Sequence, residues 1–169
     1  MIKLLRHLLA ILLLPFSVAV LGPVWLAREY GVMLTLGRSV GVLLLQGVGL
    51  ALLGVGLVFF VASIWRFAIQ GRGTLAPWDP PRVFVVSRPY QHVRNPMISG
   101  VILVLFGEAF GLRSWPHGIW AAGFGVLNLV YLPLVEEPGL ERRFGDSYRE
   151  YCRHIRRFIP RLGPRRSRP

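Results

Sequence analysis

The side chains best suited to bind a small charged molecule fall in two short polar clusters. The first runs from Tyr90 to Asn95 and includes Arg94, whose guanidinium suits a carboxylate, while Tyr90 and Asn95 add neutral hydrogen-bonding groups. The second is the pair Glu136 and Glu137, whose carboxylates can accept hydrogen bonds from an ammonium group or from ribose hydroxyls. Together these groups match the charges of a zwitterionic nucleoside. Either cluster alone is also typical of residues that anchor membrane helices at an interface.

Long apolar stretches must position these two clusters. Hydrophobic residues make up 53% of the 169-residue chain, in stretches at about 4–27, 40–67, 97–112 and 118–135. A helix needs roughly 20 apolar residues to cross a bilayer, so the first two stretches are long enough. The third stretch is short and can cross the bilayer only if it lies inside the bundle or if its polar flanking residues extend the span. In lipid the backbone must satisfy its own hydrogen bonds, which favours helices. The sequence therefore predicts an all-α integral membrane protein with about four transmembrane helices.

The basic residues predict the orientation of these helices. All but three of the 20 Lys and Arg residues lie at or before the start of the first stretch, after the fourth, or from the end of the second stretch to the start of the third; the exceptions are Arg28, Arg38 and Arg113. Positive residues favour the cytoplasmic side, which predicts a bacterial-type inner-membrane protein with both termini in the cytoplasm. The loop at 70–95 is then a cytoplasmic, cofactor-binding loop. Both polar clusters fall at the cytoplasmic ends of the last two helices, where they can share one site.

Small and helix-bending residues mark the first two stretches. Pro15 and Pro23 are expected to kink the first helix. A cleaved signal peptide is the alternative there, although the stretch is long, contains prolines and has no clear small-residue cleavage site. The second stretch is expected to offer a small-residue face for close helix packing, formed by Gly47, Gly49, Gly54 and Gly56.

The chain is expected to divide into three regions: a helix pair at 1–69, a catalytic region at 70–160 that includes the last two spans, and a basic tail at 161–169. Beyond Asp146, apolar residues at three- and four-residue spacing predict an amphipathic helix suited to the membrane surface. The net charge of +12 comes without any nucleic-acid motif, so membrane lipids, and not nucleic acid, are the expected partners.

A few polar residues lie apart from the two clusters. Glu108 falls within the third stretch, where a carboxylate costs a few kcal/mol unless it faces a polar cavity or a partner. Glu108 is a candidate to orient an acceptor substrate or to act as the base for that substrate. The alternative is that its side chain reaches towards Arg113. His92 and His117 are expected in loops, no metal-binding spacing occurs, and Cys152 is expected to be an ordinary packed cysteine.

The two clusters and their surroundings resemble the isoprenylcysteine carboxyl methyltransferase and phospholipid methyltransferase superfamily over roughly Gly71 to Pro160. The chain departs from the usual pattern where Asn95 replaces a frequent His, Ile98 a frequent Tyr and Arg88 a common Gly. The matching residues are Gly73-Thr74, Pro77, Ser87 to Met97, Gly100, Glu136 to Leu140, Phe144-Gly145, Tyr148, Tyr151 and Phe158 to Pro160.

This resemblance implies a membrane methyltransferase that uses S-adenosylmethionine at the cytoplasmic face and a lipophilic or membrane-embedded acceptor. Arg94 is expected to grip the methionine carboxylate, while Glu136 and Glu137 contact the amino group, ribose or adenine in an undetermined order. Because a sulfonium is already activated, positioning and exclusion of water are expected to do most of the catalysis. The implied cofactor-binding residues are Tyr90, Arg94, Asn95, Pro96, Met97, Glu136 and Glu137, with Arg94 and Glu108 as catalytic candidates.

The acceptor stays open among a C-terminal prenylcysteine, a phospholipid amine and a small lipophilic molecule, and the sequence indicates no oligomeric state. Two other functions also stay open. A membrane reductase that uses NADPH would share this architecture, because sterol reductases resemble the superfamily. A non-catalytic membrane scaffold would be consistent with the departures at Asn95 and Ile98.

Overall fold

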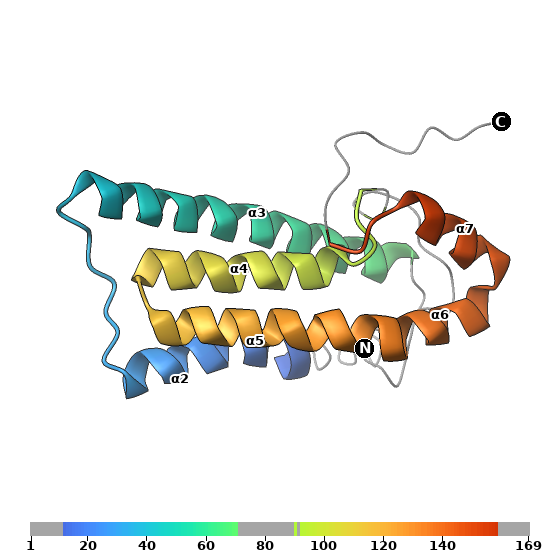
Figure 1. Ribbon diagram of the computed structural model, residues 1–169, viewed down its shortest axis with the longest axis horizontal. Coiled ribbons are helices and arrows are strands. Elements are labelled where there is room, and N and C mark those ends of the chain that lie inside the picture. Colours follow the sequence, from blue (N-terminus) through green and yellow to red (C-terminus); the bar gives the residue numbers. More distant parts are fainter. Residues whose placement is uncertain (1–11, 71–89, 91, 159–169) are drawn as a thin grey trace.

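The computed structural model describes residues 12–70, 90 and 92–158, and every regular element in these ranges is a helix (Figure 1). The expectation of an all-helical fold is thus confirmed for this part of the chain. The predictions for the loop at 71–89, with Arg88, and for the tail at 161–169 lie outside the described residues. In chain order the elements are η1 (Leu12–Leu21), α2 (Gly22–Glu29), α3 (Val40–Gln70), α4 (Pro96–Leu112), α5 (Trp115–Tyr131), η2 (Leu132–Glu136), α6 (Glu137–Phe144) and α7 (Asp146–His154).

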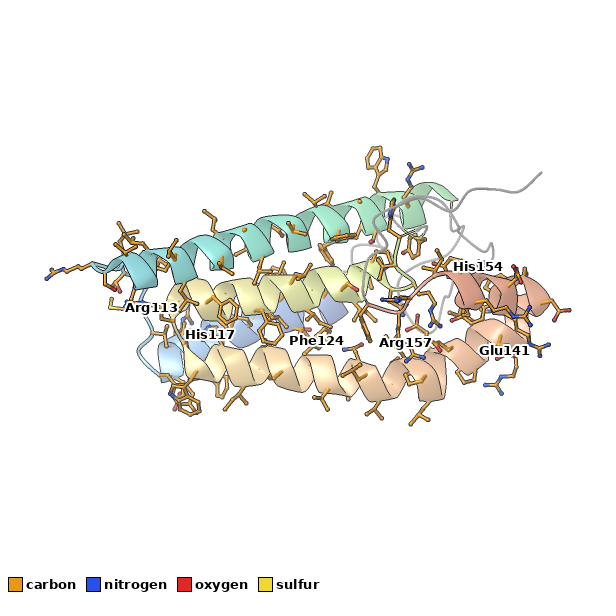
Figure 2. The ribbon with its side chains drawn as sticks, turned by 45° about the horizontal axis from the view of Figure 1, so that its top comes forward. Arg113, His117, Phe124, Glu141, His154 and Arg157 are labelled. Atoms are coloured by element: carbon orange, nitrogen blue, oxygen red, sulfur yellow. The ribbon has the colours of Figure 1, made fainter. Side chains whose placement is uncertain are left out.

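The long helices lie side by side, with α4 between α3 and α5 (Figure 1). Helix α2 lies beside α5 at the end of the bundle that carries Arg113, which we call the Arg113 end. Helices α6 and α7 lie at the opposite end, which we call the Arg94 end. Figure 2 shows Arg113 and His117 at the first end, and Arg157, Glu141 and His154 towards the second.

Among the described residues, two helical runs are long and apolar enough to cross a membrane, Val40–Arg66 and Trp115–Phe144. Large apolar side chains such as Leu44, Val58 and Leu127 are exposed on them, as expected for surfaces that face lipid. Helix α4 is also apolar but has only 17 residues. Two of the four predicted spans therefore correspond to helices that are long and apolar enough to cross a membrane, and the total of four stays a prediction.

The fourth apolar stretch does not end near residue 135, because α5, η2 and α6 form one helical run as far as Phe144. Within it, Leu132–Glu136 has the wider turns of a π-helix. Pro133 lies in this segment, and a proline removes one backbone donor from the α-helical pattern, which accounts for the local widening. Glu136 and Glu137 consequently project from a continuous helix.

Helices α3 and α4 approach each other closely enough for their backbones to touch. A Cβ atom on Gly56 would lie 2.6 Å from the carbonyl oxygen of Gly100, and one on Gly49 would lie 2.8 Å from that of Gly107. Each helix therefore contributes two glycines seven residues apart. The predicted small-residue face is correct only in part, since a Cβ on Gly47 or Gly54 would meet open space. Those two glycines point away from α4.

At the Arg113 end, side chains tie the first helices to α5. The imidazole of His117 is buried, with Nδ1 2.7 Å from Ser114 Oγ and Nε2 3.1 Å from the carbonyl oxygen of Pro23. Trp120 Nε1 donates to the carbonyl oxygen of Val18 at 3.0 Å. His117 is thus a helix-packing residue of α5, and its expected place in a loop is wrong.

The amphipathic pattern beyond Asp146 does form a helix, α7, but its apolar side faces the protein. Tyr148, Tyr151 and Ile155 are buried together and pack against α6. The reversal of direction between α6 and α7 occurs at Gly145, whose φ of 55° suits a residue without a Cβ. The expectation that this stripe lies on the membrane surface is therefore wrong, because Gly145 folds α7 back onto its neighbours.

We expect Gly56→Ala to destabilise the protein and Gly54→Ala to leave it unchanged or slightly more stable. The added methyl group at Gly56 meets the backbone of α4, and overpacking of this kind costs about 1–3 kcal/mol. The methyl group at Gly54 meets nothing, and alanine favours a helix by up to about 1 kcal/mol over glycine. Thermal unfolding in detergent measures the difference. Equal midpoints for the two variants would contradict the close contact of α3 and α4.

Candidate functional site

The centre of the polar cluster is the Glu137 carboxylate, which lies between two arginines. Arg94 Nη1 donates to Oε1 at 3.1 Å, and Arg157 donates through Nε to Oε1 at 2.7 Å and through Nη2 to Oε2 at 2.8 Å. The side chains of Arg94 and Glu137 are each only 16% exposed. The contact with Arg157 is the stronger of the two, because Arg157 donates charge-assisted hydrogen bonds to both carboxylate oxygens, whereas Arg94 donates to one.

Backbone contacts bring the two arginines together. Asn95 precedes Pro96, which begins α4 at a position where the missing N–H of proline costs nothing. Just before this helix, the N–H of Arg94 donates to the carbonyl oxygen of Arg156 at 2.9 Å, and the N–H of Asn95 donates to that of Arg157 at 3.4 Å. The segment after α7 therefore runs beside the start of α4.

Helix α7 fixes the other end of the first polar cluster. The hydroxyl of Tyr151 donates to the carbonyl oxygen of Tyr90 at 2.6 Å. The Tyr90 phenol in turn hydrogen-bonds Ser63 of α3 and lies near Glu136. Burial, and to a lesser extent the neighbouring Tyr151, raises the pKa of Tyr90 far above its usual value. Tyr90 therefore stays neutral at physiological pH and serves as a hydrogen-bonding group.

Two charged groups of the cluster retain unused hydrogen-bonding capacity. Arg94 Nη1 also donates to Cys152 Sγ at 3.2 Å, but its Nε is buried and has no partner among the described residues. Glu136 makes no hydrogen bond or ion pair with any described side chain, although it adjoins Glu137 and Tyr90. Buried polar groups are normally satisfied, so an unpaired buried donor in the same polar cluster as an unpaired carboxyl group favours a place for a ligand.

The structure brings most of the predicted site residues to the Arg94 end. Arg94 and Glu137 are in contact, Tyr90 and Glu136 adjoin them, and Asn95, Pro96 and Met97 form the start of α4 beside them. Glu108 is the exception. It lies 12 residues beyond Pro96 on α4, which corresponds to about 18 Å along the helix. Its Oε2 is buried without a partner, and Arg113 donates instead to Thr35 Oγ1 at 2.6 Å.

Sequence reasoning missed Arg157, which appears in Figure 2 beside α6 and α7. In the sequence it is one of many arginines that follow the fourth apolar stretch, and these together indicate only the orientation of the helices. One signal could have singled it out. Arg157 directly precedes Phe158 to Pro160, the last segment of the superfamily resemblance, whereas a purely solvated arginine would have no fixed relation to that motif.

A bundle of apolar helices that ends in a compact group of charged side chains is the architecture of a membrane protein with a polar site at one end. The sequence model of a family described as phospholipid methyltransferase matches residues 43–147, more than half of the chain. The chain therefore belongs to the phospholipid methyltransferase family, as its motifs predicted, and its class of activity is membrane methyl transfer. No curated protein and no solved structure matches it.

The family match includes both predicted polar clusters and ends at residue 147. It thus contains both Arg94 and Glu137, which are in contact. The family description also suggests that the substrate is a lipid. Arg157 and most of α7 lie beyond the match. The contacts of Arg157 are therefore a feature that only the structure reveals.

We expect Glu137→Ala to lower stability by about 3 kcal/mol, because it leaves two half-buried guanidiniums facing each other without a counter-charge. Glu141→Ala is the matched control on the same helix. The Glu141 side chain is 45% exposed and, within the described part of the chain, pairs with the exposed Arg149, so its loss should cost less than about 1 kcal/mol. Thermal unfolding in detergent compares the two variants. Similar losses would show that the Glu137 network contributes no more than a surface ion pair.

Proposed function

We propose that this protein transfers a methyl group from S-adenosylmethionine to a lipophilic, membrane-embedded acceptor at the cytoplasmic face of the bacterial-type inner membrane. The family match supports methyl transfer and a lipid substrate. The cofactor assignment is based on two groups at the Arg94 end that have no partner among the described residues. These are the buried Nε of Arg94 and the carboxylate of Glu136. They complement the carboxylate and the ammonium group of a methionine moiety.

Each residue of the cluster has a binding role in this proposal. Arg94 binds the methionine carboxylate through its unused Nε–H, and Glu136 accepts hydrogen bonds from the ammonium group. Tyr90 is neutral and adjoins Glu136, so it contributes a hydrogen bond without competing charge. Asn95, Pro96 and Met97, at the start of α4, form the adjoining wall.

Beyond binding the cofactor, methyl transfer requires few chemical steps from the side chains. S-adenosylmethionine supplies a methyl group on a sulfonium that departs as a neutral thioether, so no side chain has to protonate the leaving group. The side chains hold the reactants in line and keep water away, and such positioning accounts for a large part of many rate enhancements. Methylation of a carboxylate releases no proton, whereas methylation of an amine does, and Asn95 cannot accept a proton as the frequent His could. In this proposal a proton released by an amine acceptor therefore passes to water.

The acceptor reaches the site laterally, between helices whose outer surfaces face lipid. Its reactive group is at the Arg94 end, because the cofactor is bound there. Glu108 lies about 18 Å further along α4 and cannot touch the same reacting atoms. We therefore assign Glu108 to a contact with a more distant part of the acceptor.

Calorimetric titration of the detergent-purified protein tests the cofactor. S-adenosylhomocysteine should bind, NADPH should not, and Glu136→Gln should weaken binding at least tenfold because it removes the charge facing the ammonium group. Glu141→Gln serves as the control at an exposed site of the same acidic region. Binding of NADPH alone would favour a reductase. The absence of methyl transfer from labelled S-adenosylmethionine to a lipid extract, despite binding, would favour a scaffold.

Glu108→Gln tests the acceptor assignment separately. The affinity for S-adenosylhomocysteine should stay within about twofold of the wild-type value, because Glu108 lies far from the cluster. The KM for the lipid acceptor should rise several-fold with little change in kcat, the pattern that loss of a remote binding contact produces. A drop in kcat at an unchanged KM would show instead that Glu108 acts on the reacting group.

A further inference from the structure

The two neighbouring glutamates are in different states. Both oxygens of Glu137 are occupied, since Oε1 accepts from Arg94 and Arg157 and Oε2 accepts from Arg157. Glu136 has no such partner among the described residues. These three hydrogen bonds use most of the roughly four acceptor positions of the Glu137 carboxylate, so a ligand ammonium would compete there with two guanidiniums, whereas Glu136 has no such competitor among the described residues. The pair thus divides into one carboxylate that organises the site and one that can receive a ligand.

Arg157 is held in place at several points. Ile155, two residues earlier, is almost fully buried against Tyr148 and Tyr151. The carbonyl oxygen of Arg157 accepts from the N–H of Asn95, while its side chain binds both oxygens of Glu137. Arg157 therefore links the start of α4 to the start of α6. The adjacent Arg156 is exposed, and its side chain makes no hydrogen bond or ion pair with any residue in the described ranges.

The occupation of Glu137 by Arg157 limits what Arg94 can do. A carboxylate and a guanidinium that face each other alone tend to form two parallel hydrogen bonds. Here Arg157 takes that arrangement, so Arg94 reaches Glu137 through Nη1 only and its Nε stays unpaired. Without Arg157, the Glu137 carboxylate would draw Arg94 into the bidentate pair. The Nε–H required for a ligand carboxylate would then be consumed.

We propose that Arg157 is a positioning residue: by binding both oxygens of Glu137 it keeps the Arg94 Nε–H free for the ligand carboxylate and leaves Glu136 as the ligand-binding carboxylate. This inference rests on the proposed binding of S-adenosylmethionine. Arg157 itself touches neither the cofactor nor the acceptor. The hydrogen bond to Glu137 raises the pKa of Arg157, so the residue stays charged over the whole working range of pH.

The experiment compares S-adenosylhomocysteine affinities of four detergent-purified proteins by calorimetry: wild type, Arg157→Ala, Arg156→Ala and the double variant Arg157→Ala with Glu137→Gln. Arg157→Ala should weaken binding at least tenfold, while Arg156→Ala should remain within twofold. The double variant should regain most of the loss, because a neutral amide no longer captures Arg94. In turnover assays, Arg157→Ala should raise the KM for S-adenosylmethionine and leave kcat nearly unchanged.

The rescue separates this role from a purely structural one. If Glu137 bound the ligand ammonium itself, the double variant would be the weakest binder, and that result would overturn the proposal. Unchanged affinity in Arg157→Ala would overturn it as well, with the cofactor assignment intact. If wild type did not bind S-adenosylhomocysteine, the proposed function would fail, and this inference with it.

Conservative variants keep the test decisive if Arg157→Ala does not fold. Arg157→Lys retains the charge that offsets Glu137, so it should bind within about fivefold of wild type, and Arg157→Gln should bind more weakly than Arg157→Lys. Equal affinities for the Lys and Gln variants would show that the charge of Arg157 is irrelevant and would overturn the proposal.

Discussion

The arrangement of the Arg94 end depends on one carboxylate shared by two guanidiniums. Arg94 and Arg157 repel each other, and the carboxylate of Glu137 between them offsets this repulsion. The three residues come from the approach to α4, the start of α6 and the segment after α7. The cluster is therefore complete only when all three segments are in place, which ties the site to residues beyond the part of the chain that matches the family.

A close contact between backbones supports this charged cluster. In lipid, apolar side chains gain nothing by leaving one apolar surface for another, so helices associate through close packing of small residues. The glycine pairs of α3 and α4 provide such packing. Because α3 lies so near to α4, Ser63 can hydrogen-bond Tyr90 just ahead of α4. The site thus rests on the close backbone contact between α3 and α4.

The sequence predicted the helices, because long apolar stretches in lipid have few structural alternatives. It also predicted that the two polar clusters meet, because the order of the motifs limits which helix ends can be neighbours. It did not predict which glutamate is paired, since adjacent residues on a helix differ by about 100° and only the tertiary structure shows what each one faces. It also missed Arg157 among many arginines, because a charge count cannot separate a paired guanidinium from a solvated one. The direction of the α7 stripe was wrong because it depends on the turn at Gly145.

The shortness of α4 affects how this protein sits in a bilayer. Its 17 residues extend about 25 Å, whereas the hydrocarbon core of a typical bilayer is about 30 Å thick. Such hydrophobic mismatch is relieved when the membrane thins locally or when polar flanks are drawn inward. With α4 as a predicted span, either adjustment would bring the charged residues at its start closer to the glycerol backbone of the surrounding lipids. A lipid headgroup can then approach them by sideways diffusion, without its acyl chains leaving the leaflet.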